Sequence, residues 1–98
     1  MHTSGVWAIL EHGRVDRQVA KVPREVLKRY EKWKDIVRLS GPPGVRLITG
    51  FHDEALAGQW RGFRSSRLGD QWRVIYRVDT DALAYYIESI TAHDYRRK

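Results

Sequence analysis

The segment 56–78 reads LAGQWRGFRSSRLGDQWRVIYRV, and its pattern decides the fold class. Two runs within it, 60–68 and 72–78, have the composition of β-strands. Between them stands Gly69-Asp70-Gln71, which suits a hairpin turn. A third strand-like run, 83–90, follows the turn sequence 79–82. The sequence therefore predicts an antiparallel three-stranded meander in the C-terminal half.

Alternation along the run 72–78 predicts what each face of the middle strand carries, because successive side chains in a strand point to opposite faces. One face would hold the apolar side chains of Trp72, Val74, Tyr76 and Val78. The other would hold Arg73, Ile75 and Arg77. We expect the first face to pack on helices and the second to carry charge.

The N-terminal half predicts one short strand, 6–10, and a pair of helices over about 16–39 with a break at Pro23. The second helix has an apolar stripe of Val26, Tyr30, Trp33 and Val37, widened by Leu27 and Ile36. Gly41 with the two following prolines is expected to end it. The stretch 41–58 then reads as a long connection, with 45–48 as a short extended piece. This order predicts an α+β domain with the helices on one side of a sheet.

Composition predicts a single folded domain over residues 1–98, with 42% hydrophobic and 31% charged residues. The absence of cysteine excludes disulfides and thiolate metal sites. The apolar run 6–10 is too short for a signal-peptide core or a membrane span. We expect a cytoplasmic protein that does not enter the membrane.

The charge predicts a polyanionic partner, since 18 Lys and Arg against 12 Asp and Glu leave a net charge of +6. Between residues 58 and 77 there are five arginines, no lysine and one acid, Asp70. Aromatic residues are interleaved with these arginines, and both residue types suit contacts with phosphates and bases.

These residues together resemble the toxins of the RelE/ParE superfamily. The resemblance rests on the Leu-x-Gly piece at 56–58, a short strand that ends near an arginine, the aromatic-Arg-x-x-Tyr piece at 72–76 and the ending ITAHDY at 90–95. The run 60–64 (WRGFR) and the terminal His93 are most similar to the YafQ and HigB branches. The resemblance covers nearly the whole chain. It implies the α+β RelE-like fold, in which an N-terminal strand and a helical hairpin pack on a mainly antiparallel sheet.

The resemblance also implies a function, that of the toxin of a type II toxin–antitoxin system. Such a toxin is a ribosome-dependent endoribonuclease that cleaves mRNA in the A site and is silenced by a cognate antitoxin. The ribose 2′-OH attacks the neighbouring phosphate, and neither a metal nor a cofactor is implied. Arginine suits the phosphate charge and histidine suits proton transfer near neutral pH. The expected partners are the antitoxin, the ribosome and mRNA, and the expected state is a monomer or a toxin–antitoxin hetero-oligomer.

The site residues follow from the matching positions. The resemblance assigns catalytic roles to His93, Arg73, Arg67 and Tyr95, with Arg73 as the phosphate-binding arginine. It assigns RNA contacts to Arg61, Arg64, Arg77 and His52. The general base stays open, because Ser65 and Ser66 stand where RelE has part of its lysine pair and Gln71 stands where YafQ has an acid. His52 and Glu54 are alternatives for that role, and a polar loop cluster without a function is the other reading of 52–54. No sequence partners complete a metal site there.

Two other functions fit the same resemblance. One is a ParE-like toxin that inhibits DNA gyrase by binding and has no catalytic site. The other is a non-toxic relative that binds only an antitoxin or RNA. His93 and the arginine cluster favour the endoribonuclease, because a protein that only binds has no chemical need for a titratable group beside a phosphate-binding cluster.

Overall fold

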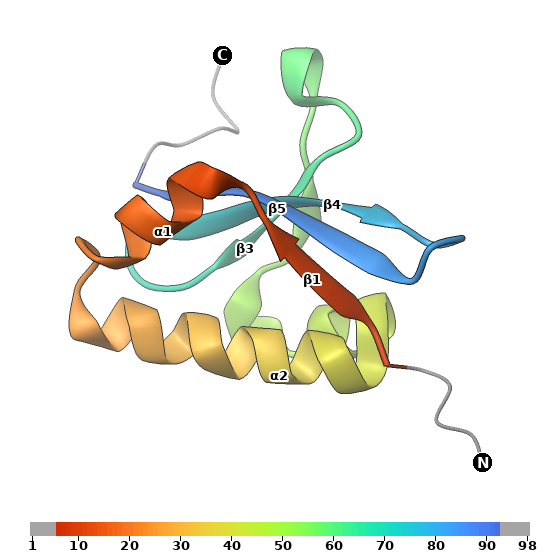
Figure 1. The fold of residues 1–98 in the computed structure, drawn as a ribbon, viewed down its shortest axis with the longest axis horizontal. Coiled ribbons are helices and arrows are strands. Elements are labelled where there is room, and N and C mark those ends of the chain that lie inside the picture. The colour runs from red at the N-terminus through yellow and green to blue at the C-terminus, as the bar shows by residue number, and fades with distance from the viewer. Residues whose placement is uncertain (1–5, 93–98) are drawn as a thin grey trace.

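Within residues 6–92, five strands form one mixed sheet, in the order β1-β5-β4-β3-β2 (Figure 1). The computed structural model describes residues 6–92, so the predictions for His93 and Tyr95 lie outside the described residues. The strands are β1 (Ala8–Glu11), β2 (Glu54–Ala55), β3 (Arg64–Arg67), β4 (Arg73–Asp79) and β5 (Ala84–Thr91). The antiparallel pairing of β3, β4 and β5 confirms the predicted meander. The N-terminal strand β1 pairs with β5 in parallel.

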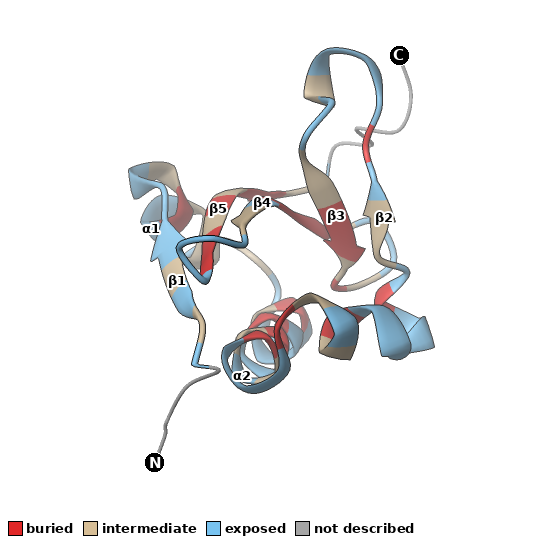
Figure 2. Cartoon of the chain, turned by 90° about the vertical axis from the view of Figure 1, so that its right-hand side faces the viewer, coloured by how far each residue is buried: buried red, intermediate tan, exposed pale blue. Residues whose placement is uncertain are grey.

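The long helix α2 (Arg24–Leu47) lies under one face of this sheet (Figures 1 and 2). Its predicted stripe is confirmed, because the side chains at 26, 30, 33 and 37 are all buried. Trp33 lies at the centre of the core, with its ring edge-on to those of Tyr76 and Tyr85. Its indole N–H donates to Ser66 Oγ at 2.9 Å, so the buried nitrogen is satisfied. This contact identifies the face of β3 that is turned toward α2.

The short helix α1 (Gly13–Val19) covers the edge of β5 where β1 no longer pairs with it. Arg14 forms an ion pair with Glu88, and Gln18 Oε1 accepts the backbone N–H of Ile90 at 2.7 Å. These contacts satisfy part of a strand edge that would otherwise be open to another chain. Residues 13–19 and 24–47 confirm the predicted helix pair, with Pro23 immediately before the second helix.

The prediction that Gly41 ends the second helix is only partly correct. Gly41 has φ 67°, and the Trp7 ring lies where its Cβ would be, so only glycine fits this position. The chain then resumes helical geometry through Pro42 and Pro43 to Leu47. Proline is tolerated in the first turn of a helix, where its missing N–H has no intrahelical partner to lose. The extended piece predicted at 45–48 is therefore wrong.

The strand predicted at 60–68 is also too long. Residues 58–60 form a 3₁₀ turn, Gly62 has φ 97°, and the β-structure begins only at Arg64. Within the predicted long connection, β2 pairs antiparallel with β3 through two residues. The β2–β3 connection rises from the sheet on the side away from α2 (Figure 1).

The predicted division of β4 into two faces agrees with the structure, although the second face is more buried than its charge suggests. Val74 and Tyr76 are buried toward the core, as expected. On the other face Ile75 and Arg73 are also buried, and of the predicted set only Arg77 is exposed. The expected charge is present on this face at Arg73 and Arg77, but Arg73 is buried and Ile75 adds an apolar side chain. No helix among residues 6–92 is long and apolar enough to cross a membrane.

Candidate active site on the sheet face turned away from α2

The sheet face turned away from α2, here called the distal face, follows from the strand register. Directly paired residues in neighbouring strands point to the same side. Ser66 and Tyr76 contact Trp33 of α2, so Arg67 and Arg73 point the other way. Arg67 pairs with Arg73, and Arg73 pairs with Thr91. These three residues form one row across β3, β4 and β5.

Buried polar atoms without a hydrogen-bond partner gather on this distal face. Within residues 6–92, five side-chain atoms on β3, β4 and β5 are buried and have no hydrogen-bond partner: Ser65 Oγ, Arg67 Nε, Arg73 Nε, Ser89 Oγ and the Tyr85 hydroxyl. Four of these five belong to the distal face, and the register places them in two neighbouring rows. Unpaired buried donors are costly and rare, and at a binding site a ligand can supply the missing acceptor. These unpartnered polar atoms make the distal face the candidate site among the described residues.

A carboxylate lies next to the two arginines. Glu54 Oε2 accepts a hydrogen bond from Arg73 Nη2 at 2.8 Å. The Arg73 side chain is only 6% exposed, whereas that of Glu54 is 34% exposed. Glu54 pairs with Ser65 in the β2–β3 ladder, so it shares the distal face. The structure therefore joins Arg67, Arg73 and Glu54 into one site that holds two positive charges and one negative charge.

Of the two alternatives for a general base, only Glu54 reaches this site in the described part of the chain. His52 is exposed in a left-handed backbone conformation, with φ 47°. It lines a different cavity of about 250 Å³ with Arg46, Thr49 and Asp53. The interpretation of residues 52–54 as a polar loop cluster without a function therefore agrees with the position of His52 but not with that of Glu54.

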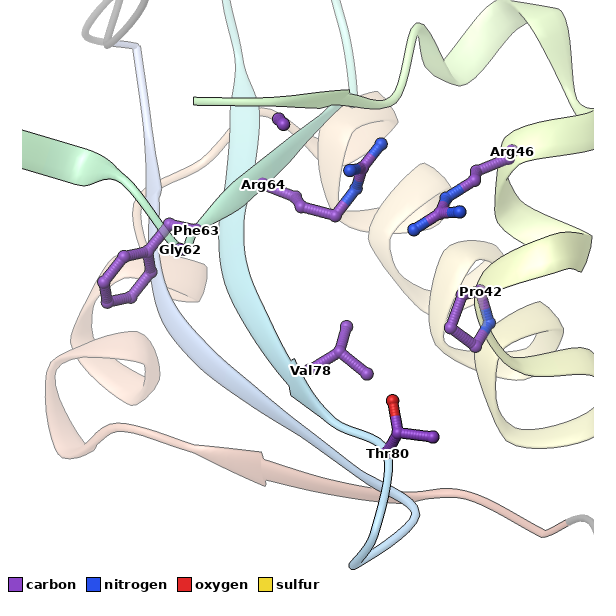
Figure 3. A pocket seen from close by; sticks show the side chains of 8 residues that line it. Pro42, Arg46, Gly62, Phe63, Arg64, Val78 and Thr80 are labelled. Carbon is purple, nitrogen blue, oxygen red and sulfur yellow. The ribbon is translucent and has the colours of Figure 1, made fainter. Parts of the chain in front are cut away.

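Arg64 lies on the opposite face of the sheet from Arg67 and Arg73. Its Nε donates to Asp53 Oδ1 at 2.7 Å, and that carboxylate is 1% exposed. Figure 3 shows Arg64 and Arg46 pointing toward each other in a cavity of about 280 Å³ between α2 and the sheet. The expectation that Arg64 shares one RNA site with Arg73 therefore has no support in this geometry.

Asp53 is the centre of a buried hydrogen-bond network on the α2 side. It accepts hydrogen bonds from the hydroxyls of Ser66 and Tyr76 in addition to Arg64. Burial, the charge of Asp53 and its hydrogen bond raise the pKa of Tyr76 far above its usual value, so this phenol stays protonated and remains a donor. Burial opposes the charge on Arg64, but the hydrogen bond and the charge of Asp53 outweigh it and raise the pKa of Arg64. This network joins the residue before β2 to β3 and β4.

The other predicted RNA contacts are exposed. Arg61 lies in the β2–β3 connection. Arg77 lies over the Tyr86 ring, with 4.3 Å between the guanidinium carbon and the ring centroid. Because Arg77 is four residues from Arg73, the two are about 13 Å apart along β4. Neither arginine belongs to the row of Arg67 and Arg73. Among the described residues, no group of three or more His, Asp or Glu side chains could hold a metal ion.

Two features of the site were missed in the sequence. The cross-strand pairing of Arg67 with Arg73 could have been predicted by placing the two strands antiparallel with residues 69–71 as the turn. The Glu54–Arg73 ion pair had no local signal, because it depends on a two-residue strand inside a predicted loop.

Several solved structures are similar to this chain, although no protein-family model and no curated protein matches its sequence. A chain of the archaeal RelE–RelB complex from Pyrococcus horikoshii aligns over 95% of this chain and 98% of its own length, with a TM-score of 0.69 and 22% identity. YafQ from E. coli aligns over 86% and 90%, with a TM-score of 0.69 and 17% identity. A YoeB/ParE toxin from Agrobacterium tumefaciens aligns over 89% and 99%, with a TM-score of 0.70 and 12% identity. The chain has the RelE/ParE toxin fold, which confirms the fold that the segments 56–78 and 90–95 indicated.

Proposed function

We propose that this chain is the toxin of a type II toxin–antitoxin pair and that it is a ribosome-dependent endoribonuclease. Its cytoplasmic target is mRNA in the ribosomal A site, and a cognate antitoxin silences it. The fold likeness supports the toxin role, since the similar structures include toxins and a toxin–antitoxin complex. The net charge of +6 supports a polyanionic substrate.

The enzymatic part of the proposal rests on one observation, the Glu54–Arg73 ion pair beside Arg67 on the distal face. Arg73 holds the carboxylate through Nη2, while its Nε and that of Arg67 have no hydrogen-bond partner within residues 6–92. A phosphate bound against the guanidinium groups of Arg67 and Arg73 would accept hydrogen bonds from their N–H donors. Its neighbouring ribose would then lie beside a fixed carboxylate. Charge-assisted contacts of this kind hold the substrate and stabilise the charge that develops in the transition state.

The reaction balances with protein groups alone. Glu54 accepts the proton of the ribose 2′-OH while the 2′ oxygen bonds to phosphorus. Arg67 and Arg73 stabilise the additional negative charge on the phosphate oxygens. The bond from phosphorus to the 5′ oxygen then breaks, and an acid protonates the leaving oxygen. The products are a 2′,3′-cyclic phosphate and a 5′-hydroxyl.

We assign the acid to His93, which lies outside the described residues, two positions after Thr91. Thr91 pairs with Arg73, so the chain leaves the sheet beside the proposed phosphate position. Tyr95 is retained as a further tail residue of the site. The exposed Arg61 and Arg77 are proposed to contact RNA outside the reacting nucleotide. Arg64 and His52 do not lie on the distal face, so any RNA contact that they make is proposed to be elsewhere on the surface.

Induced expression of the chain in a host that lacks its antitoxin should stop translation before it affects DNA replication. The reason is that the proposed site promotes cleavage of the RNA backbone, and its proposed substrate is mRNA that is being translated. Primer extension on cellular transcripts should then show new 5′ ends inside reading frames. Intact messages together with a DNA-damage response would instead support the gyrase-binding function.

Replacement of His93 with Gln should slow cleavage by about 10²-fold, the usual effect of removing a general acid, and should leave RNA affinity unchanged. Glutamine keeps the polar side chain but cannot supply a proton near neutral pH. Single-turnover cleavage on programmed ribosomes measures the rate, and circular dichroism melts show whether the variant is folded. A folded variant that cuts at the wild-type rate would remove His93 from the mechanism.

A further inference from the structure

The cavity between α2 and the sheet, here called the α2 cavity, has no part in the proposed reaction. Its volume is about 280 Å³, near the lower end of the range for small-ligand pockets. Arg46 and Arg64 are its charged lining residues, and Pro42, Ala55 and Val78 give it apolar walls. Because Arg64 faces α2, the cavity lies on the opposite side of the sheet from the candidate active site.

The two arginines of the α2 cavity are positioned by the fold. Arg64 is fixed by the 2.7 Å hydrogen bond from its Nε to Asp53 Oδ1. Arg46 follows Val45, whose side chain is fully buried and anchors the last turn of α2 in the core. Within residues 6–92, the Arg46 side chain has no ion pair. Asp53 thus offsets the charge of Arg64, and one positive charge at the cavity is left without an opposite charge.

The orientation of the two guanidinium groups favours an anion between them. Figure 3 shows Arg46 and Arg64 pointing toward each other across the α2 cavity. Like charges that approach in this way repel each other, and an anion bound between them removes the repulsion. The planar guanidinium group also matches a carboxylate in shape, because it can donate two parallel hydrogen bonds to it.

A buried hydroxyl near these charges adds a further donor. The Tyr85 hydroxyl is the unpartnered buried atom that does not belong to the distal face, and its cross-strand partner Val78 lines the α2 cavity. Burial raises the pKa of this phenol and the charge of Asp53 raises it further, so it stays protonated. The charges of Arg46 and Arg64 act on it in the opposite direction, so the phenol lies near both. The polar end of the cavity is therefore rich in donors.

We propose that the α2 cavity binds a small organic acid. Its carboxylate lies between Arg46 and Arg64, and its apolar body packs on Pro42 and Val78. An inorganic anion would occupy only the charged end and leave the apolar walls in contact with water, whereas an apolar body covers them. This site does not depend on the proposed endoribonuclease activity, because it shares no residue with the row of Arg67 and Arg73.

The test is an NMR titration of the full-length protein, followed at the backbone amide of Val78. The four probes are benzoate, acetate, orthophosphate and benzyl alcohol. Benzoate should bind about tenfold more tightly than acetate or orthophosphate, because only benzoate joins a negative charge to an apolar ring. Benzyl alcohol keeps the ring but carries no charge, and it should also bind about tenfold more weakly than benzoate.

Replacement of Arg46 with Gln should weaken benzoate binding by about tenfold or more. The variant should remain folded, because Arg46 is exposed and has no ion pair within residues 6–92. Arg46→Lys should restore part of the affinity, since lysine keeps the charge but lacks the planar fork. Arg24→Gln is the matched control, because it makes the same change in net charge at an exposed position at the other end of α2. It should bind benzoate as the wild type does.

Each of the other outcomes would overturn the inference. Unchanged binding in Arg46→Gln, or equal binding of benzyl alcohol and benzoate, would show that the arginines do not hold the ligand. Orthophosphate that binds as tightly as benzoate would replace the organic acid with a simple anion. The absence of a shift with all four probes would reject the site. Single-turnover mRNA cleavage tests the proposed function separately, so the failure of one is distinguishable from the failure of the other.

Discussion

Glu54→Gln should slow single-turnover mRNA cleavage by about 10³-fold, within the usual range for loss of a general base. The amide is nearly the same size as the carboxylate, and its oxygen can still accept the hydrogen bond that Arg73 Nη2 donates at 2.8 Å. What it loses is the ability to take the 2′ proton. We therefore expect a folded protein that binds programmed ribosomes and cuts very slowly.

Glu88→Gln is the control for this substitution. Glu88 is also a part-buried carboxylate paired with an arginine, Arg14, but it lies where β5 meets α1. It should cut at the wild-type rate. Wild-type cleavage by Glu54→Gln, with an unchanged melting temperature, would show that another group takes the proton.

Arg73→Lys should reduce the cleavage rate by about 10²-fold or more while RNA affinity falls much less. Lysine keeps a positive charge near Glu54, but it lacks the planar fork that lets one side chain bind both the carboxylate and a phosphate oxygen. The loss should therefore fall mainly on the transition state, where the phosphate carries more charge than in the bound substrate. Cleavage on programmed ribosomes gives the rate, and titration with ribosomes gives the affinity.

Arg64→Lys tests whether the two faces of the sheet have different roles. Arg64 and Arg73 are both arginines of neighbouring strands in ion pairs with a carboxylate, but Arg64 faces α2 through Asp53. Its substitution should lower thermal stability, because Asp53 is buried and loses the Nε–H donor that now bonds it. Cleavage by the folded fraction should stay near the wild-type rate. A loss of cleavage equal to that of Arg73→Lys, without a loss of stability, would contradict the separation of the faces.

The elements with strong local patterns were predicted correctly. The stripe at 26, 30, 33 and 37 depends only on helical periodicity, and every one of its side chains is buried. The meander depends on strand composition and turn residues, and β4 and β5 follow it closely. The errors fall at 45–48 and 60–63. Pro42 and Pro43 begin a helical turn that runs to Leu47, and Gly58 begins a 3₁₀ turn that ends at Trp60. Composition alone predicted extended structure in both places.

The sequence by itself determined the order of helices and strands, the RelE/ParE resemblance and the set of arginines from which a site could be built. Only the tertiary structure decided which of those arginines act together. Side-chain direction in a strand alternates with each residue, so Arg64 and Arg67 face opposite sides, and only the register shows that Arg67 meets Arg73. Glu54, which stands 19 residues before Arg73, reaches the site through a strand of two residues, which is too short to leave a periodic signal. The residue types of the site could be read from short stretches of sequence, whereas their arrangement depended on pairing between strands that are distant in the sequence.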